Sequence, residues 1–315
     1  MNQLNDKRPL EGIRAYRFCI PLARELTLKG KSYREREGIL LESDGQWAEA
    51  SPLPGFSTET IDEVIAALRG ERLPPASVEF ALESLQEPLR PPLQVPFNHL
   101  LLGDRVSVLE NARRCAASSC QAVKLKVGRG TLDVDIQVIR EVRECLPAAT
   151  ALRLDANQAW SFAEAISVLG QLSDLEIEYI EEPLQDASQL EALYAETGIR
   201  YALDETLLRE THLQAWPNAA ALICKPTLLG GRKAVTRLAA LGKPIVFSAA
   251  FESGVGIARL VQLASEFSPQ IPAGLDTLDW LSQDLLRSSP SKLNGMFNFA
   301  ELPTVDTSDL ELIEL

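Results

Sequence analysis

Three acidic residues are spaced along the chain at intervals that suit a single site. Glu181 follows Asp155 after 26 residues, and Asp204 follows Glu181 after 23. Carboxylate oxygens are hard ligands, and three of them with room for water suit Mg²⁺, with Mn²⁺ as the substitute to expect. Such a metal ion can bind a substrate carboxylate and stabilise the enediolate that forms when the adjacent carbon loses its proton. Glu182 and Glu205 stand beside Glu181 and Asp204, and spacing alone does not choose within either pair.

Lysines flank these carboxylates along the sequence. Lys124 and Lys126 lie two residues apart in the run KLKV, so on a strand both side chains point to one face. Lys225 follows Asp204 after 21 residues and precedes a proline. A lysine among other cations and near a divalent metal ion can have its pKa lowered enough to act as a general base. These residue types therefore predict the removal of a proton from a carbon next to a carboxylate.

A regular alternation of strands and helices is predicted to bring these residues together. The strand candidates are 97–102, 122–127, 150–156, 175–181, 200–204, 220–225, 244–249 and 271–275. The segments between them carry the apolar stripe of helices that pack on a sheet. A repeat of about 25 residues with eight strands is typical of a closed parallel barrel, whose active site lies at the carboxyl ends of the strands. A doubly wound open sheet is the less favoured alternative.

Further polar residues share the inward face of the predicted strands. Arg153 and Asn157 have the same parity as Asp155. Both are predicted to contact the side chains that bind the metal ion rather than the metal ion itself. Lys124 is predicted to support Lys126 electrostatically, with a purely structural ion pair as an equal alternative. Ordinary ion pairs inside a barrel explain any one of these charges, but they explain poorly a set on five consecutive strands. A Schiff-base aldolase also uses an interior lysine, yet it has no need of three carboxylates.

The composition excludes several classes of protein. The 315 residues are 46% hydrophobic and 24% charged, which is enough to bury a large core. The net charge of −13 and the lack of a basic patch argue against a nucleic-acid partner. No run approaches the roughly 18 apolar residues of a membrane span, and the polar N-terminus does not resemble a signal peptide. We therefore expect no membrane insertion, a small-molecule carboxylate substrate, and either a monomer or a homo-oligomer.

The cysteines and histidines point to a reduced, cytoplasmic protein. The five cysteines are odd in number and form no CxxC pair, so they are interpreted as free thiols. The two histidines, His99 and His212, are far apart and have no metal-type spacing. This pattern argues against histidine-based catalysis and against a zinc site.

The N-terminal part of the chain predicts a separate domain. Residues 12–53 are strand-like, with a turn at Ser43-Asp44-Gly45. A capping box that starts at Thr60 opens a helix to Gly70, and a second helix is expected from about Ala76. Four prolines in the segment 88–96 then mark a domain boundary.

Several motifs, taken in order, resemble those of the enolase superfamily and its muconate-lactonizing subgroup. They are KLK, LRLDANQAW, EEP, LDE and CKPTLLGG. Together with GQWAEASPLPGFSTET and GLDTLDWL, they are similar to the o-succinylbenzoate synthases. KxK and EEP alone would be weak signals, but the resemblance runs in this order over nearly the whole chain.

The resemblance implies a fold and an activity. The expected fold is α/β, a (β/α)7β modified TIM barrel over residues 94–280 with an α+β capping domain. Residues 1–93 would form the cap, and residues 281–315 would return to it. The implied activity is that of a lyase: the Mg²⁺-dependent syn dehydration of 2-succinyl-6-hydroxy-2,4-cyclohexadiene-1-carboxylate to o-succinylbenzoate, on the way to menaquinone or phylloquinone.

The same resemblance assigns roles to particular residues. Lys126 would remove the proton next to the carboxylate and return a proton to the departing hydroxide. Lys225 would stabilise the enediolate from the opposite face. The metal ligands would be Asp155, Glu181 and Asp204, which selects one residue from each acidic pair.

Other residues are expected to contact the substrate or to cover it. Ser248 and Gly274 resemble positions that hold the succinyl tail. Ser253 opens a predicted helix whose free N–H groups are expected to meet a substrate carboxylate. The loop Pro52–Phe56 and the segment 23–31 are predicted to lie over the barrel mouth as a lid, although 23–31 carries no specific pattern.

Two other functions compete with the dehydratase. With a lysine on each face, the same scaffold could serve as an N-acylamino acid racemase or a dipeptide epimerase. An inactive barrel that acts as a binding protein is less favoured, because all five key residues are present.

Overall fold

A closed parallel barrel forms the larger part of the structure, a computed structural model that describes residues 12–210 and 213–315. Its sheet follows chain order through β5 (Asn98–Leu101), β6 (Ala122–Lys126), β7 (Ala151–Asp155), β8 (Tyr179–Glu181), β9 (Tyr201–Leu203), β10 (Ala221–Cys224) and β11 (Ile245–Phe247). The prediction of a barrel is confirmed, and the alternative prediction of an open doubly wound sheet is wrong. Two features interpreted from the sequence, His212 and the polar N-terminal segment 1–11, lie outside the described residues.

The eighth predicted strand is present only as two bridging residues that close the barrel. Ala273 pairs with Phe97 on one side, and Gly274 pairs with Ser248 on the other, both in parallel orientation. The N–H of Gly274 donates to the carbonyl of Phe247 at 2.7 Å. Pro272 has no N–H to donate and glycine is a weak strand former, which explains why this strand is so short.

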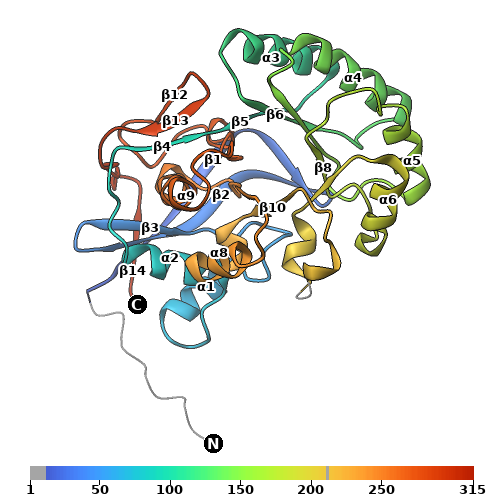
Figure 1. The fold of residues 1–315 in the computed structure, drawn as a ribbon. Helices are drawn as coiled ribbons and strands as arrows, with labels where there is room; N and C mark the ends of the chain where they lie inside the picture. The colour runs from blue at the N-terminus through green and yellow to red at the C-terminus, as the bar shows by residue number, and fades with distance from the viewer. Residues whose placement is uncertain (1–11, 211–212) are drawn as a thin grey trace, which may run out of the picture.

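Helices cover the outside of the barrel (Figure 1). They are α3 (Arg105–Ala117), α4 (Leu132–Cys145), α5 (Phe162–Gly170), α6 (Leu190–Thr197), α7 (Pro226–Leu229), α8 (Gly231–Ala239) and α9 (Gly254–Phe267). In the described part of the β9–β10 connection, 3₁₀ turns at Glu205–Leu208 and Leu213–Ala215 replace a helix. Helix α9 is buried on nearly all sides because it packs between the barrel strands and the cap.

An antiparallel sheet and two helices form the cap. The sheet has the order β14-β1-β2-β3, from β1 (Arg14–Leu28), β2 (Lys31–Ser43), β3 (Gln46–Ala50) and β14 (Glu311–Ile313). The helices are α1 (Ile61–Leu68) and α2 (Ala76–Leu85). Thr60 and Glu63 form the predicted capping box at the start of α1. Buried aliphatic side chains of the sheet and both helices make a separate hydrophobic cluster.

The first and last strands that the structure describes lie together in the cap. Strand β14 pairs with β1, so that Ala15 lies opposite Ile313. A second small sheet joins β4 (Leu93–Pro96) to β13 (Met296–Phe299) and β12 (Ser291–Leu293). These pairings agree with a C-terminal segment that returns to the N-terminal part, while the boundaries 1–93, 94–280 and 281–315 stay a prediction. Among the helices of the described ranges, none is both long and apolar enough to cross a bilayer.

Candidate active site

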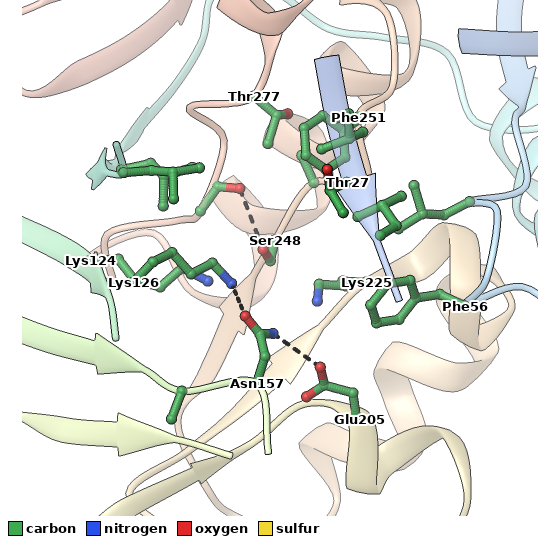
Figure 2. A pocket seen from close by; sticks show the side chains of 18 of the residues that line it. Thr27, Phe56, Lys124, Lys126, Asn157, Glu205, Lys225, Ser248, Phe251 and Thr277 are labelled. Carbon is green, nitrogen blue, oxygen red and sulfur yellow. Dashed lines mark hydrogen bonds between the residues drawn. The ribbon is translucent and has the colours of Figure 1, made fainter. Parts of the chain in front are cut away.

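The predicted catalytic charges meet at the carboxyl end of the barrel strands. Asp155 ends β7, Glu181 ends β8 and Asp204 follows β9, and these residues are 0%, 1% and 3% exposed. Lys124 and Lys126 reach into the same space from β6, and Lys225 does so from the end of β10 (Figure 2). Strand parity thus placed both lysines of the KLKV run on the inner face, as predicted.

The lysines and carboxylates form a connected cluster. Lys124 Nζ lies 3.0 Å from Asp155 Oδ2 and 3.2 Å from Glu181 Oε1. Lys126 Nζ lies 2.5 Å from Asp155 Oδ2 and donates to Asn157 Oδ1 at 2.5 Å. On the other side of the cavity, Lys225 is paired with Asp204. We call these residues, with Glu205, the mouth cluster.

Burial and charge shift the pKa values within the mouth cluster in opposite directions. Burial, and then the charge of Asp155, raise the pKa of Glu181 well above its usual value. Burial also raises the pKa of Asp155, but the ammonium groups of Lys126 and Lys124 outweigh it and hold this pKa well below its usual range. For Lys124, burial works against the charged form, while Glu181 and Asp155 prevail and raise the pKa.

The three buried carboxylates are candidate ligands for a divalent cation. Asp155 and Glu181 lie opposite each other in the parallel register of β7 and β8, so two acidic groups are crowded together. Burial, and after it the charge of Asp155, raise the pKa of Glu181, and a cation with two charges would favour its ionised form. The donor set is made of hard oxygen atoms only, which suits Mg²⁺ better than a thiophilic metal ion.

Glu181 and Glu182 point to different sides of the strand. Glu181 faces the lysines, whereas Glu182 accepts hydrogen bonds from the N–H groups of Asp204 and Thr206 at 2.7 and 2.8 Å. The hydroxyl of Thr206 adds a third bond at 2.9 Å. Glu182 therefore fixes the backbone at the end of β9, and only Glu181 is placed among the candidate metal ligands.

Asp204 and Glu205, in contrast, both belong to the site. Glu205 lines the cavity and accepts a hydrogen bond from Asn157 Nδ2 at 3.0 Å, while its Oε2 is buried without a hydrogen-bond partner in the described structure. Burial, helped by the charge of Asp204, raises its pKa to about 7. Strand alternation could not assign Glu205, because β9 ends at Leu203 and a 3₁₀ turn follows.

A cavity of about 410 Å³ lies above these groups, between the barrel and the cap. Leu26, Thr27, Leu28 and Lys29 line it from the β1–β2 hairpin, and Leu53 and Phe56 line it from the loop after β3. Both predicted lid segments therefore contact the space above the mouth. Ser248 and Gly274 line the same cavity. Their contact with the substrate is therefore possible in this geometry and stays a prediction.

The structure corrects the expectation for Ser253. This residue caps α9, but its N–H and hydroxyl donate to Glu49 of the cap at 3.1 and 2.5 Å. The N–H of Gly256 donates to the same carboxylate. A carboxylate of the protein itself thus occupies the helix N-terminus, so Ser253 is not free for a substrate.

Arg153 takes part in a different set of contacts from the one expected. Its guanidinium pairs with Glu178 at 2.5 Å and donates to Asn98 Oδ1 at 3.1 Å and to the carbonyl of Pro272 at 2.6 Å. These partners connect β7 with the start of β5 and with the segment that closes the barrel. Arg153 therefore stabilises barrel closure, while Asn157 is the predicted support that does contact Lys126.

The comparisons with known proteins first define the class. A sequence model described as Enolase C-terminal domain-like matches residues 107–303, more than half of the chain. The L-Ala-D/L-Glu epimerase of Bacillus subtilis has the same fold, with a TM-score of 0.76, 18% identity, and coverage of 96% of this chain and 99% of that one. The capped barrel with acidic residues at its mouth is thus a member of the enolase superfamily.

A narrower family follows from closer relatives. A model described as MenC, N-terminal domain matches residues 11–73. The o-succinylbenzoate synthase of Klebsiella pneumoniae is 32% identical over 316 residues, which cover 91% of this chain and 97% of that protein. The chain belongs to the o-succinylbenzoate synthase family. The structure of such a synthase from Thermosynechococcus elongatus, described as complexed with Mg in the active site, matches with a TM-score of 0.73, 25% identity, and coverage of 88% and 96%.

Proposed function

We propose that this protein is a Mg²⁺-dependent o-succinylbenzoate synthase that dehydrates 2-succinyl-6-hydroxy-2,4-cyclohexadiene-1-carboxylate. The observation that carries the proposal is the placement of Lys126 and Lys225 on opposite sides of one cavity (Figure 2), each paired with a buried carboxylate. Family membership supports the substrate, and the cavity of about 410 Å³ has room for a small dicarboxylate.

Lys126 is the proposed general base and acid. Its Nζ takes the proton from the ring carbon that bears the carboxylate, and the electron pair left behind forms the new ring double bond. The hydroxide leaves from the neighbouring carbon, takes that proton from Lys126 and departs as water. A syn elimination requires both transfers on one face, which a single lysine on that face can perform.

Lys225 and the acidic residues are proposed to stabilise charge. Lys225 remains protonated, since Asp204 and Glu181 raise its pKa against the effect of burial, and it faces the substrate from the other side. Asp155, Glu181 and Asp204 are the residues that would hold Mg²⁺, which supplies positive charge to the substrate carboxylate. Replacement of Mg²⁺ by Mn²⁺, a cytoplasmic location and the monomeric or homo-oligomeric state remain predictions from the sequence.

An absorbance assay tests the reaction and the metal requirement together. The purified protein is mixed with the cyclohexadiene substrate in Mg²⁺, then in EDTA, and then again in excess Mg²⁺. We expect conversion to the aromatic product that stops with EDTA and returns with Mg²⁺. If calorimetry shows that Mg²⁺ binds and no conversion occurs, the proposed substrate is wrong.

A racemase or epimerase activity is the second candidate, and the two lysines on opposite sides of the cavity favour it. Such an enzyme would exchange the α-proton of an N-succinylamino acid through both lysines. Incubation in D₂O, followed by NMR and optical rotation, measures that exchange. Exchange faster than dehydration would make this activity the main one. A protein that neither binds Mg²⁺ nor turns over either substrate would instead be a binding protein.

A further inference from the structure

A second cluster of metal-binding side chains lies outside the barrel mouth. His99 lies on β5, Cys115 in the last turn of α3, and Cys120 just before β6. One ligand atom from each of these residues lies within 4.8 Å of the other two. The sequence pattern had argued against a zinc site, because the two histidines are far apart and have no metal-type spacing.

Local structure explains how the three residues meet. Asn98 points into the barrel toward Arg153, so the next residue, His99, points outward to the layer of α3. After α3, Ser119 adopts a positive φ of 56°, which turns the chain back toward β6. This turn places Cys120 beside Cys115, and the two buried thiols then lie close to the half-buried imidazole between strand and helix.

The chemistry of these ligands differs from that of the mouth cluster. One imidazole nitrogen and two sulfurs suit a borderline or soft cation such as Zn²⁺, whereas Mg²⁺ prefers oxygen. Bond lengths of about 2.3 Å to sulfur and about 2.0 Å to nitrogen place tetrahedral ligands about 3.5 Å apart. The three ligand atoms would therefore have to move only slightly closer together to bind one cation. The Cys115 thiol, which donates a hydrogen bond to Cys120, and the nearby His99 lower the pKa of Cys120 against the effect of burial, whereas the same hydrogen bond and burial raise the pKa of Cys115. Cys120 is therefore the thiol that gives up its proton more readily to a metal ion.

The surroundings of His99 also resemble those of a metal ligand. His99 Nδ1 lies 3.6 Å from Asp276 Oδ2, an arrangement in which a carboxylate can orient the imidazole. Asp276 is itself held by Lys292 at 2.9 Å. A side cavity of about 350 Å³ borders His99, Cys115 and Asp276, so a metal ion and a water molecule have a route of entry.

We propose that His99, Cys115 and Cys120 form a second metal site for one thiophilic cation of the zinc type. The fourth position opens to the side cavity, where water can complete a tetrahedral set. Asp276 also lines the main cavity, so occupation of this site is expected to affect the substrate pocket through that residue. The inference is independent of the proposed dehydration.

Another group of potential ligands provides an internal control. Cys19, Glu35 and Glu37 are also close together, but they lie on the face of the cap sheet with one sulfur and no imidazole. Cys19 is exposed, and its neighbours are acidic groups of a kind that often cluster without an ion. We therefore expect this group not to hold a zinc-type cation, and Cys19→Ser serves as the matched control.

The test is a titration of the reduced, metal-free protein with Co²⁺ in saturating Mg²⁺. We expect one equivalent to bind with thiolate-to-cobalt charge-transfer absorption, and Zn²⁺ to displace it. Cys115→Ser and Cys120→Ser should each lose the absorption or weaken binding at least tenfold, whereas Cys19→Ser should leave both unchanged. Circular dichroism checks that the variants fold.

His99→Gln, which keeps both thiols, provides a second test if a cysteine variant unfolds, and it should weaken Co²⁺ binding at least tenfold. The proposal is overturned if no charge-transfer band appears at one equivalent. It is also overturned if the band persists unchanged in folded Cys115→Ser and Cys120→Ser proteins, or in His99→Gln. Because none of these residues is assigned to catalysis, either outcome leaves the absorbance assay of the dehydratase valid.

Discussion

Two groups of buried charges in this protein are satisfied in different ways. The mouth cluster consists of carboxylates that face lysines and one another. At the interface between cap and barrel, Arg36 donates instead to four backbone carbonyls, those of Ser51, Pro52, Ala250 and Phe251. We call Arg36 and Glu49 the interface cluster. Both groups are buried, but the lysines and carboxylates of the mouth cluster pair mainly with groups that ionise, whereas the hydrogen bonds of Arg36 are all to groups that do not.

Glu49 shows the same pattern as Arg36. It accepts from the Ser51 hydroxyl at 2.6 Å and from the N–H groups of Ser253 and Gly256 at 3.1 Å each. In the mouth cluster, by comparison, Glu205 Oε2 has no hydrogen-bond partner among the described residues. Backbone partners hold a charge in one place, whereas partners that titrate or exchange ligands leave it available for chemistry. The contrast separates buried polar groups whose contacts join the cap to the barrel from buried charges that are poised to react.

The largest expected effect is the loss of activity in Lys126→Ala. Removal of the proposed base should lower kcat by about 10³-fold or more, equivalent to about 4 kcal/mol of activation free energy. The fold should persist, because Lys124 still pairs with the buried Asp155 at 3.0 Å when Lys126 is removed. Steady-state kinetics and circular dichroism measure both quantities. Lys233→Ala, at an 83% exposed lysine on α8, is the control and should behave like the wild type. An active Lys126→Ala protein would remove this residue from the mechanism.

Arg36→Met should destabilise the fold more than any other single charge removal at the interface. The substitution leaves four buried carbonyls without their donor, and we expect the free energy of unfolding to fall by about 3–5 kcal/mol. Arg34→Met is a matched control on the same strand, because Arg34 is 86% exposed and, among the described residues, its salt bridge is with Glu25 alone. Its effect should stay below about 0.5 kcal/mol. Similar losses in both variants, measured by chemical denaturation, would refute the distinction between the clusters.

Stability should depend on pH through Glu49. Burial raises the pKa of Glu49 to about 7 in the folded protein, from an ordinary value of 4.5. The folded state thus keeps a proton that the unfolded state loses, so this contribution is complete below pH 4.5 and disappears as the pH rises through about 7. The loss amounts to about 3 kcal/mol.

Denaturation of wild type and Glu49→Gln between pH 5 and pH 8 measures this contribution. The variant should have a flatter stability profile across that range, because glutamine stays neutral. Glu42→Gln is the control, since Arg14 lowers the pKa of Glu42 and its contribution has the opposite sign. An unchanged slope in Glu49→Gln would show that another group titrates.

The smallest expected effects concern two adjacent glutamates. Glu181→Gln should weaken Mg²⁺ binding at least about tenfold, or about 1.4 kcal/mol, because a proposed ligand loses its charge. Glu182→Gln should change Mg²⁺ affinity less, but it should lower the free energy of unfolding by about 1–2 kcal/mol, since its backbone hydrogen bonds are weakened. Calorimetry and denaturation of the pair check both quantities. Equal losses of Mg²⁺ affinity would place both side chains in the mouth cluster.

The sequence by itself predicted the barrel and the principal charges at its mouth. Both depend on local periodicity: strand alternation orients Lys124 and Lys126, and a β/α repeat places Asp155 and Glu181 at neighbouring strand ends. The capping box at Thr60 is equally local and is confirmed. Patterns of this kind survive folding because hydrogen bonding within each element enforces them.

Only the tertiary structure decided where distant groups meet. Ser253 was expected to bind substrate, but Glu49, 204 residues away in sequence, occupies the N-terminus of α9. Glu205 entered the site because the chain leaves strand geometry after Leu203. His99 joined Cys115 and Cys120 only when α3 packed beside β5. Such contacts depend on which surfaces pack together, and the spacing of residues along one chain carries no record of that choice.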